Sequence, residues 1–233
     1  MSTIANNLQA VDAAIAAAAQ AAQRSREDVR LLAVSKTFGP DAVLEALRAG
    51  QTAFGENYVQ EALDKIAALE GHGIEWHFIG PIQSNKTRPI ANHFDWVHTV
   101  ERLKIAQRLS EQREPGRAPL NICLQVNVSG EESKSGCTPE ELPALAEAVK
   151  ALPNLRLRGL MAIPEPETDY DKQRAAFRKL RGLFERLNAQ GFGLDTLSMG
   201  MSADMQAAVA EGATIVRVGS AIFGARTYAQ ERQ

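Results

Sequence analysis

The run Leu31-Leu32-Ala33-Val34-Ser35-Lys36 is short and apolar, and it ends in a lysine. It is followed by a break at Gly39 and Pro40 and then by apolar residues at helical spacing in residues 43–47. A short apolar run of this kind predicts a buried β-strand, and the longer stretch after the break predicts an α-helix. The segment therefore indicates one strand–loop–helix unit.

The same unit recurs along the chain. Strand candidates occur at Leu31–Ser35, Ala53–Gly55, Glu75–Ile79, Trp96–Thr99, Asn121–Val126, Leu157–Ala162, Thr196–Met199 and Ile215–Val218. Strict strand–helix alternation predicts a parallel sheet of the α/β class. Eight units in roughly 200 residues favour a closed (β/α)8 TIM barrel over an open doubly wound sheet, which is the fallback.

The chain has no interior linker, so we expect a single barrel domain over residues 1–233. Residues 1–24 predict an extra N-terminal helix packed on the barrel, because Ile4, Leu8, Val11 and Ile15 share one helical face. Residues 225–233 are expected to form a tail.

Composition limits the classes of partner and the compartment. With 26 Lys and Arg against 28 Asp and Glu, the chain has no basic excess for nucleic acid or anionic lipid. It has neither an apolar run of the roughly 18 residues that a membrane helix needs nor a secretory signal. Cys123 and Cys137 make neither a disulfide framework nor a metal site. We expect a cytoplasmic protein.

In a barrel of this kind the reacting groups gather at the carboxyl ends of the strands. Strand alternation places Lys36 on the same side as Leu32 and Val34, so its amine is expected to point into the mouth of the barrel. Burial favours the neutral amine, which is the form that attacks aldehydes. The alternative is an ordinary lysine that extends to solvent or pairs with a carboxylate.

The last strand supplies a second feature. Gly219 and Ser220 follow it, and Ser202 is expected to open the helix after the seventh strand, so that free amides and hydroxyls form a phosphate pocket. Such residues also make ordinary turns. A closed barrel brings this pocket beside Lys36, and the pair suits pyridoxal 5'-phosphate. Arg217 would then donate to the ring nitrogen, unless it forms an ion pair inside the barrel.

Several segments resemble one known family. They are residues 33–36, 54–58, 76–86, 159–161, 197–205 and 217–224, in order and spacing over nearly the whole chain. The resemblance is to the pyridoxal phosphate homeostasis proteins, the YggS/PROSC group. It implies a fold type III barrel similar to the N-terminal domain of alanine racemase, with Lys36 as the Schiff-base lysine. It further implies cofactor-binding roles for Asn57, Met161, Ser202, Arg217, Gly219 and Ser220.

We predict a protein that binds pyridoxal 5'-phosphate and stores or supplies it, without robust turnover. Racemisation needs a second acid or base on the opposite face of the cofactor, and Tyr58 and His77 are the candidates to stand in for it. Apo enzymes that depend on this cofactor are the expected recipients, and the expected state is a monomer or weak homodimer. The alternatives are a slow amino-acid racemase and a phosphosugar barrel enzyme that uses Lys36.

Two polar stretches are expected to be loops. One contains Lys134, within residues 131–136, and the other runs through Gln83, Asn85, Lys86 and Arg88. Such loops are usually only solvated, and they could also guide cofactor entry or contact recipient enzymes.

Overall fold

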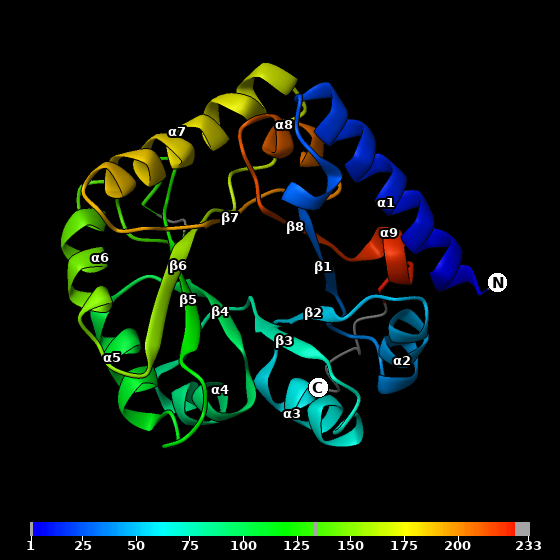
Figure 1. Ribbon diagram of the computed structural model, residues 1–233, viewed down its shortest axis with the longest axis horizontal. Coiled ribbons are helices and arrows are strands. Elements are labelled where there is room, and N and C mark those ends of the chain that lie inside the picture. The colour runs from blue at the N-terminus through cyan, green and yellow to red at the C-terminus, as the bar shows by residue number, and fades with distance from the viewer. Residues whose placement is uncertain (1, 133–134, 227–233) are drawn as a thin grey trace, which may run out of the picture.

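The computed structural model describes residues 2–132 and 135–226. These residues contain eight parallel strands that close into one barrel (Figure 1). The strands are β1 (Arg30–Val34), β2 (Ala53–Glu56), β3 (Glu75–Phe78), β4 (Trp96–Val100), β5 (Leu120–Gln125), β6 (Leu155–Met161), β7 (Thr196–Ser198) and β8 (Ile215–Val218). The predicted (β/α)8 TIM barrel is confirmed.

The strands pair in sequence order, and β1 pairs with β8 to close the ring. In that closing pair Arg30 lies opposite Ile215 and Ala33 lies opposite Val218. The ends of the first and last strands therefore lie side by side. This seam is the place where the sequence predicts the amine and the phosphate pocket to meet.

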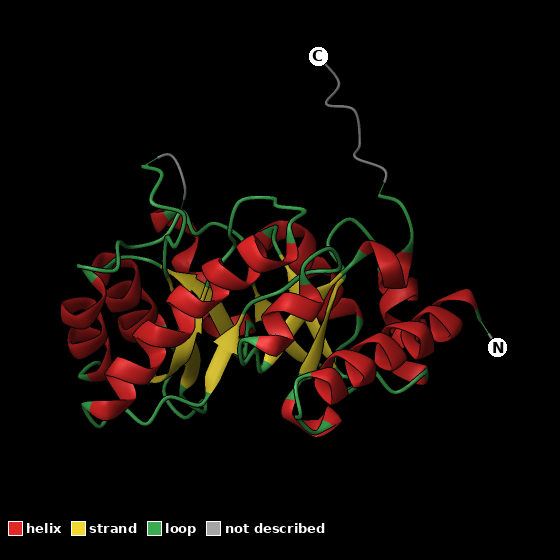
Figure 2. Cartoon of the chain, turned by 90° about the horizontal axis from the view of Figure 1, so that it is seen from above, coloured by secondary structure: helices red, strands yellow, loops and turns green. Residues whose placement is uncertain are grey.

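Helices cover the outside of the barrel (Figures 1 and 2). They are α1 (Thr3–Ala21), α2 (Pro40–Arg48), α3 (Val59–Ala68), α4 (Thr87–His93), α5 (Leu103–Gln112), α6 (Leu142–Lys150), α7 (Tyr170–Ala189), α8 (Met205–Ala210) and α9 (Ser220–Phe223). Single-turn 3-10 segments lie at η1 (Arg26–Asp28) and η2 (Ser84–Lys86).

The barrel interior and the layer under the helices form two separate apolar clusters. The inner one consists of Leu32, Val34, Ala53, Ile79, Trp96, Cys123, Met161 and Ile215. The outer one includes the alternate strand residues, such as Ala33 and Phe54, packed against the helices. Successive strand side chains face opposite sides, so the predicted inward side of β1 is the observed one.

Helix α1 lies across one side of the barrel against α2, α8 and α9. Ser2 caps it by accepting a hydrogen bond from the Ala5 amide at 3.1 Å. Its buried face includes Leu8, Val11 and Ile15. The Asn7 amide group also donates to the Ile222 carbonyl at 2.8 Å, which ties α1 to α9.

The expectation of a polar loop through Gln83 to Arg88 was wrong. Residues 84–86 form η2, and α4 begins at Thr87, so Arg88 lies in the first turn of a helix. The Thr87 side chain is buried, and its hydroxyl donates to Gln112 at 2.7 Å. This contact holds the segment against α5 and cannot be read from the polar sequence. Lys134 lies outside the described residues.

Within the described residues, no helix combines the length and apolarity needed to cross a lipid bilayer.

Gly159 is predicted to be indispensable for closing the sheet between β6 and β7. A Cβ atom there would lie 1.7 Å from the Thr196 carbonyl oxygen, so Gly159→Ala should lower the free energy of unfolding by about 3 kcal/mol. Gly182, inside α7, has open space around it, and Gly182→Ala should instead add about 0.5–1 kcal/mol. Urea unfolding of both variants checks this, and equal effects of the two would contradict it.

Candidate functional site

Lys36 lies two residues beyond the end of β1 and is half-buried at the mouth of the barrel. Burial lowers the pKa of its amine, and the nearby positive charge of Arg226 lowers that pKa further. Both effects favour the neutral amine, which is the nucleophilic form.

The backbone on both sides of Lys36 is held in place. Before it, the Ser35 amide donates to the Gly55 carbonyl at 3.0 Å. After it, Thr37 has a φ of 70°, and its amide donates to a Glu61 carboxylate oxygen at 2.6 Å. A non-glycine residue seldom adopts a positive φ unless its surroundings impose it. The direction in which Lys36 leaves the strand is therefore fixed by its neighbours.

A buried charged cluster between β2 and α3 provides that support. The Lys65 ammonium lies 2.7 Å from carboxylate oxygens of both Glu56 and Glu61, and it donates to the Ser35 carbonyl at 2.8 Å. The Ser35 hydroxyl donates to Glu56 at 2.7 Å. Burial raises the pKa of the Glu56 carboxyl, and the Lys65 ammonium opposes that rise. The cluster joins α3 to both ends of the Ser35–Thr37 segment.

Asn57 follows β2 at the same mouth. Its side-chain oxygen is buried and has no hydrogen-bond partner among the described residues. Gly80 packs against its backbone so closely that a Cβ atom there would lie 2.3 Å from the Asn57 carbonyl oxygen. A buried acceptor without a donor is costly, so this side chain is suited to receive a donor from a ligand.

Arg217 is buried inside the barrel at β8, next to the ends of β6 and β7. Its guanidinium donates to the Ser198 hydroxyl at 2.7 Å and to the Ala162 carbonyl at 3.1 Å. Burial lowers its pKa to about 10, and the charge of Asp204 opposes that shift. Both hydrogen-bond acceptors are neutral, so the predicted alternative of an ion pair is not what these contacts show. Met161, the last residue of β6, lies in the same interior.

The turn after β7 differs from the prediction that Ser202 opens a helix. Helix α8 begins at Met205, and Ser202 lies exposed in the preceding turn. Gly200 has a φ of 102°, and the Asp204 carboxylate accepts from the Met201 amide at 2.7 Å. This side-chain contact closes the turn and delays the helix by three residues.

Gly219 and Ser220 lie at the start of α9, across the β1–β8 seam from Lys36. The first turn of a helix leaves its amides without intrahelical partners. A Cβ atom at Gly219 would lie 3.2 Å from the Val34 carbonyl oxygen and 2.1 Å from a terminal nitrogen of Arg226. A side chain at position 219 would displace the Arg226 guanidinium and press against the Val34 carbonyl, so glycine leaves the most room at this point of the seam.

Arg226 was missed because residues 225–233 were expected to form a tail. Its guanidinium lies against Gly219 and approaches the Val34 carbonyl at 3.5 Å. Its Nε atom is buried without a hydrogen-bond partner among the described residues. No periodicity signals such a residue, because it lies beyond the last helix.

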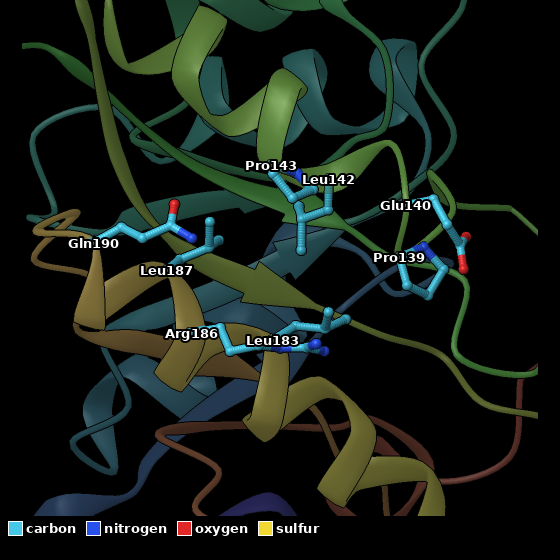
Figure 3. A pocket seen from close by; sticks show the side chains of 8 residues that line it. All are labelled: Pro139, Glu140, Leu142, Pro143, Leu183, Arg186, Leu187 and Gln190. Carbon is cyan, nitrogen blue, oxygen red and sulfur yellow. The ribbon is translucent and has the colours of Figure 1, made fainter.

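Two adjoining hollows open at the mouth. One of 130 Å³ includes Asn57, Thr99 and Gln125, and one of 580 Å³ includes Gln125, Met201 and Asp204. A further groove of 380 Å³ lies on the outer surface between α6 and α7 (Figure 3), where Leu142, Leu183 and Arg186 are among its lining residues. That groove contains none of the predicted site residues.

Tyr58 and His77, the two candidates for a second acid or base, lie in different environments. Tyr58 is exposed at the start of α3, whereas His77 is buried inside the barrel and bonded to Glu75 and His98. His77 is therefore a core residue with its hydrogen bonds satisfied. No cluster of three or more potential metal ligands occurs in the part of the chain that is described.

Comparison with known proteins decides the family. The family described as alanine racemase, N-terminal domain, matches residues 7–227. A Pseudomonas aeruginosa protein named pyridoxal phosphate homeostasis protein is 68% identical over 228 residues, covering 98% of each chain. One of the same name from Escherichia coli K12 is 53% identical over 234 residues, covering 99% of this chain and 100% of that one. This chain belongs to the pyridoxal phosphate homeostasis protein family.

The resemblance predicted from the sequence segments is thus confirmed. PipY of Synechococcus elongatus, solved with pyridoxal phosphate bound, superimposes with a TM-score of 0.79 at 39% identity and covers 95% of this chain and 100% of its own. Alanine racemase from Corynebacterium glutamicum superimposes with a TM-score of 0.67 at 18% identity, covering 99% of this chain and 63% of its own. The latter shows a shared fold.

In this member of the homeostasis-protein family, the buried cluster is predicted to depend on its central cation. Lys65→Met leaves Glu56 buried without a counter-charge and should lower the free energy of unfolding by about 3–5 kcal/mol. Burial keeps the folded-state pKa of Glu56 above its unfolded value, so the folded state takes up the proton more readily and stability falls as pH rises. The loss should be greater at pH 8 than at pH 5.

Urea unfolding at the two pH values measures this. Adding Glu56→Gln to Lys65→Met removes the stranded charge and should restore part of the stability and remove the extra pH dependence. Equal losses at both pH values would contradict the account of Glu56.

Proposed function

We propose that this protein binds pyridoxal 5'-phosphate through Lys36 and acts in the storage and supply of that cofactor. The observation that carries the proposal is the β1–β8 seam, where a half-buried amine with a lowered pKa lies across from a glycine-lined helix start. Lys36 would hold the cofactor through its neutral amine, which would bond to the carbonyl carbon with loss of one water. The cofactor supplies an electrophilic carbonyl.

The residues around Lys36 fit such a ligand. Arg217 is a buried donor whose protein acceptors are neutral, and it is the proposed partner of the ring nitrogen. Asn57 offers a buried oxygen without a donor among the described residues. Gly219 and Ser220, with the exposed Ser202, are proposed to hold the phosphate, and Met161 to pack beside the ring.

Arg226 adds a cation to the proposed phosphate site. Its guanidinium occupies the space in front of Gly219, close enough to lower the pKa of Lys36. A phosphate bound there would meet both the amides of α9 and a guanidinium, which are its strongest protein partners. Arg226 would have to turn toward the incoming anion or give way to it.

The same residues favour a protein that supplies the cofactor over one that catalyses robust turnover of a substrate. Arg217 can only donate, so it would leave the ring nitrogen unprotonated, and the cofactor would then be a weaker electron sink than one with a carboxylate partner. His77 is one of the two residues considered as a second acid or base. It is buried, and both of its ring nitrogens are in hydrogen bonds inside the barrel. The alternative of a slow racemase rests on likeness to alanine racemase, which at 18% identity shows the fold alone.

The setting proposed for this activity is the cytoplasm. Cys123 and Cys137 are both free thiols, and burial raises the pKa of each to about 12, so both stay protonated. Apo enzymes that use pyridoxal 5'-phosphate are the proposed recipients, and a monomer or weak homodimer is the proposed state. The closed barrel of the described residues leaves no free sheet edge that would require a second copy.

The absorption spectrum of the reconstituted protein tests the role of Lys36. Wild type incubated with pyridoxal 5'-phosphate should keep a near-visible band through gel filtration, because the cofactor is covalently held. Lys36→Ala should lose or shift the band, whereas the exposed Lys179→Ala, on α7, should keep it. Identical spectra of Lys36→Ala and wild type would refute the assignment.

A second measurement concerns Arg226. Arg226→Gln should raise the Kd for pyridoxal 5'-phosphate about tenfold or more and flatten its dependence on salt, because a hydrogen bond to a charged group is lost. Arg186→Gln, in the outer groove, is the matched control and should bind as wild type does. Equilibrium titration followed by fluorescence checks both, and an unchanged Kd for Arg226→Gln would exclude a role for this guanidinium.

A further inference from the structure

A continuous line of hydrogen-bonded side chains crosses the barrel interior. At one end a Glu75 carboxylate oxygen lies 2.7 Å from Nε2 of His77. Nδ1 of His77 lies 2.8 Å from Nε2 of His98, and Nδ1 of His98 lies 2.8 Å from the Ser198 hydroxyl. The Ser198 hydroxyl in turn accepts from Arg217 at 2.7 Å.

The two ends of the line fix the direction of every bond in it. Arg217 can only donate, and the pKa of Glu75 is lowered to about 2, chiefly by its bond to His77, so Glu75 can only accept at neutral pH. The Ser198 hydroxyl accepts from Arg217 and has its own proton left for Nδ1 of His98. Both histidines then carry their proton on Nε2, and each donates toward Glu75.

The surroundings favour this neutral arrangement. His77 and His98 are fully buried, and burial lowers the pKa of each imidazole. The charged groups that act on them are Glu75, Asp95, Arg30 and Arg217. Trp96 stacks on the His77 ring with centroids 5.2 Å apart and an angle of 10°, which holds the ring plane. Every ring nitrogen in the line is thus hydrogen-bonded, and one ring is packed against Trp96.

We propose that His98, supported by His77, is a positioning residue that acts through Ser198 to hold Arg217 against the ring nitrogen of the bound cofactor. The inference rests on the proposed function, because Arg217 needs a ligand to act on. Without a fixed acceptor on Ser198, the guanidinium keeps the Ala162 carbonyl as its remaining acceptor among the described residues. The donor aimed at the ring nitrogen would then be less well ordered.

Two substitutions at His98, to asparagine and to leucine, distinguish a positioning role from a packing role. In His98→Asn, the side-chain oxygen can replace Nδ1 as the acceptor for Ser198, while the link to His77 is lost. His98→Leu fills similar space and offers no acceptor. Ser198→Ala removes the hydroxyl itself and tests the same link from the other side. His93→Leu makes the same chemical change at an exposed position and is the control.

The readouts are the rate of cofactor release, the near-visible spectrum of the bound cofactor, and the difference in melting temperature between holo and apo forms. A residue that only packs would lower both melting temperatures equally. We expect His98→Leu and Ser198→Ala to release pyridoxal 5'-phosphate about tenfold faster, with an altered spectrum and a smaller holo–apo difference. His98→Asn should recover most of the wild-type behaviour.

Wild-type release, spectrum and holo–apo difference in His98→Leu would overturn the inference, as would equal defects in His98→Asn and His98→Leu. If His98→Leu fails to fold, Ser198→Ala decides in its place, and wild-type behaviour of that variant would overturn the inference. Lys36→Ala, measured in parallel, separates the two claims. If the band is lost in Lys36→Ala while the other variants behave as wild type, only the positioning role is refuted. If the band is unaltered in Lys36→Ala, the link through Lys36, on which the proposed function rests, is refuted.

Discussion

The backbone pairing of β1 with β8 brings together segments that are far apart in the sequence. Its register sets Ala33 opposite Val218, so the next residues on each strand, leading to Lys36 and Gly219, emerge at the same edge. A slip of one residue would move Leu32 and Val34 to the outer face of the barrel and displace the turn that carries Lys36, because strand side chains alternate. Leu32 and Val34, packed among the inner residues, prevent that slip.

Two buried cations near this edge, Lys65 and Arg217, have different kinds of hydrogen-bond acceptor. Lys65 lies between two carboxylates and donates its remaining hydrogen bond to the Ser35 carbonyl, so its charge is neutralised within the protein. Arg217 donates to neutral acceptors and relies on a line of neutral imidazoles behind Ser198. A buried cation bonded to carboxylates ties local structure together, whereas one whose hydrogen-bond acceptors are neutral is suited to an electron-rich ligand. The first therefore supports the backbone at Lys36, and the second is the residue proposed to face the cofactor.

The fold and the approximate ends of the strands could be predicted from sequence, since apolar runs alternate with helical periodicity throughout. The inward direction of Arg217 also follows from strand parity, whereas Lys36 lies in the turn beyond β1, where neighbouring residues hold the backbone. Helix α4 was missed because its sequence, Thr87–His93, is short and contains an internal proline and several polar residues. The start of α8 was misplaced because the Asp204 side chain closes a turn at the place where Ser202 was expected to open the helix.

Contacts between distant side chains lay beyond sequence reasoning. Arg226 reaches Gly219 only because the chain turns back after α9, and the line from Glu75 to Arg217 joins four strands with no common sequence spacing. The Glu56–Lys65–Glu61 cluster likewise combines a strand residue with two helix residues. Such contacts are specified by the closed barrel as a whole.

The most direct test of the account is chemical trapping at the seam. Borohydride reduction of the protein loaded with pyridoxal 5'-phosphate makes the C=N link permanent, and tryptic peptide mapping then locates it. The account predicts one labelled peptide, residues 31–48, in which cleavage after Lys36 is blocked. A label on a different lysine, or no labelled peptide at all, would contradict it.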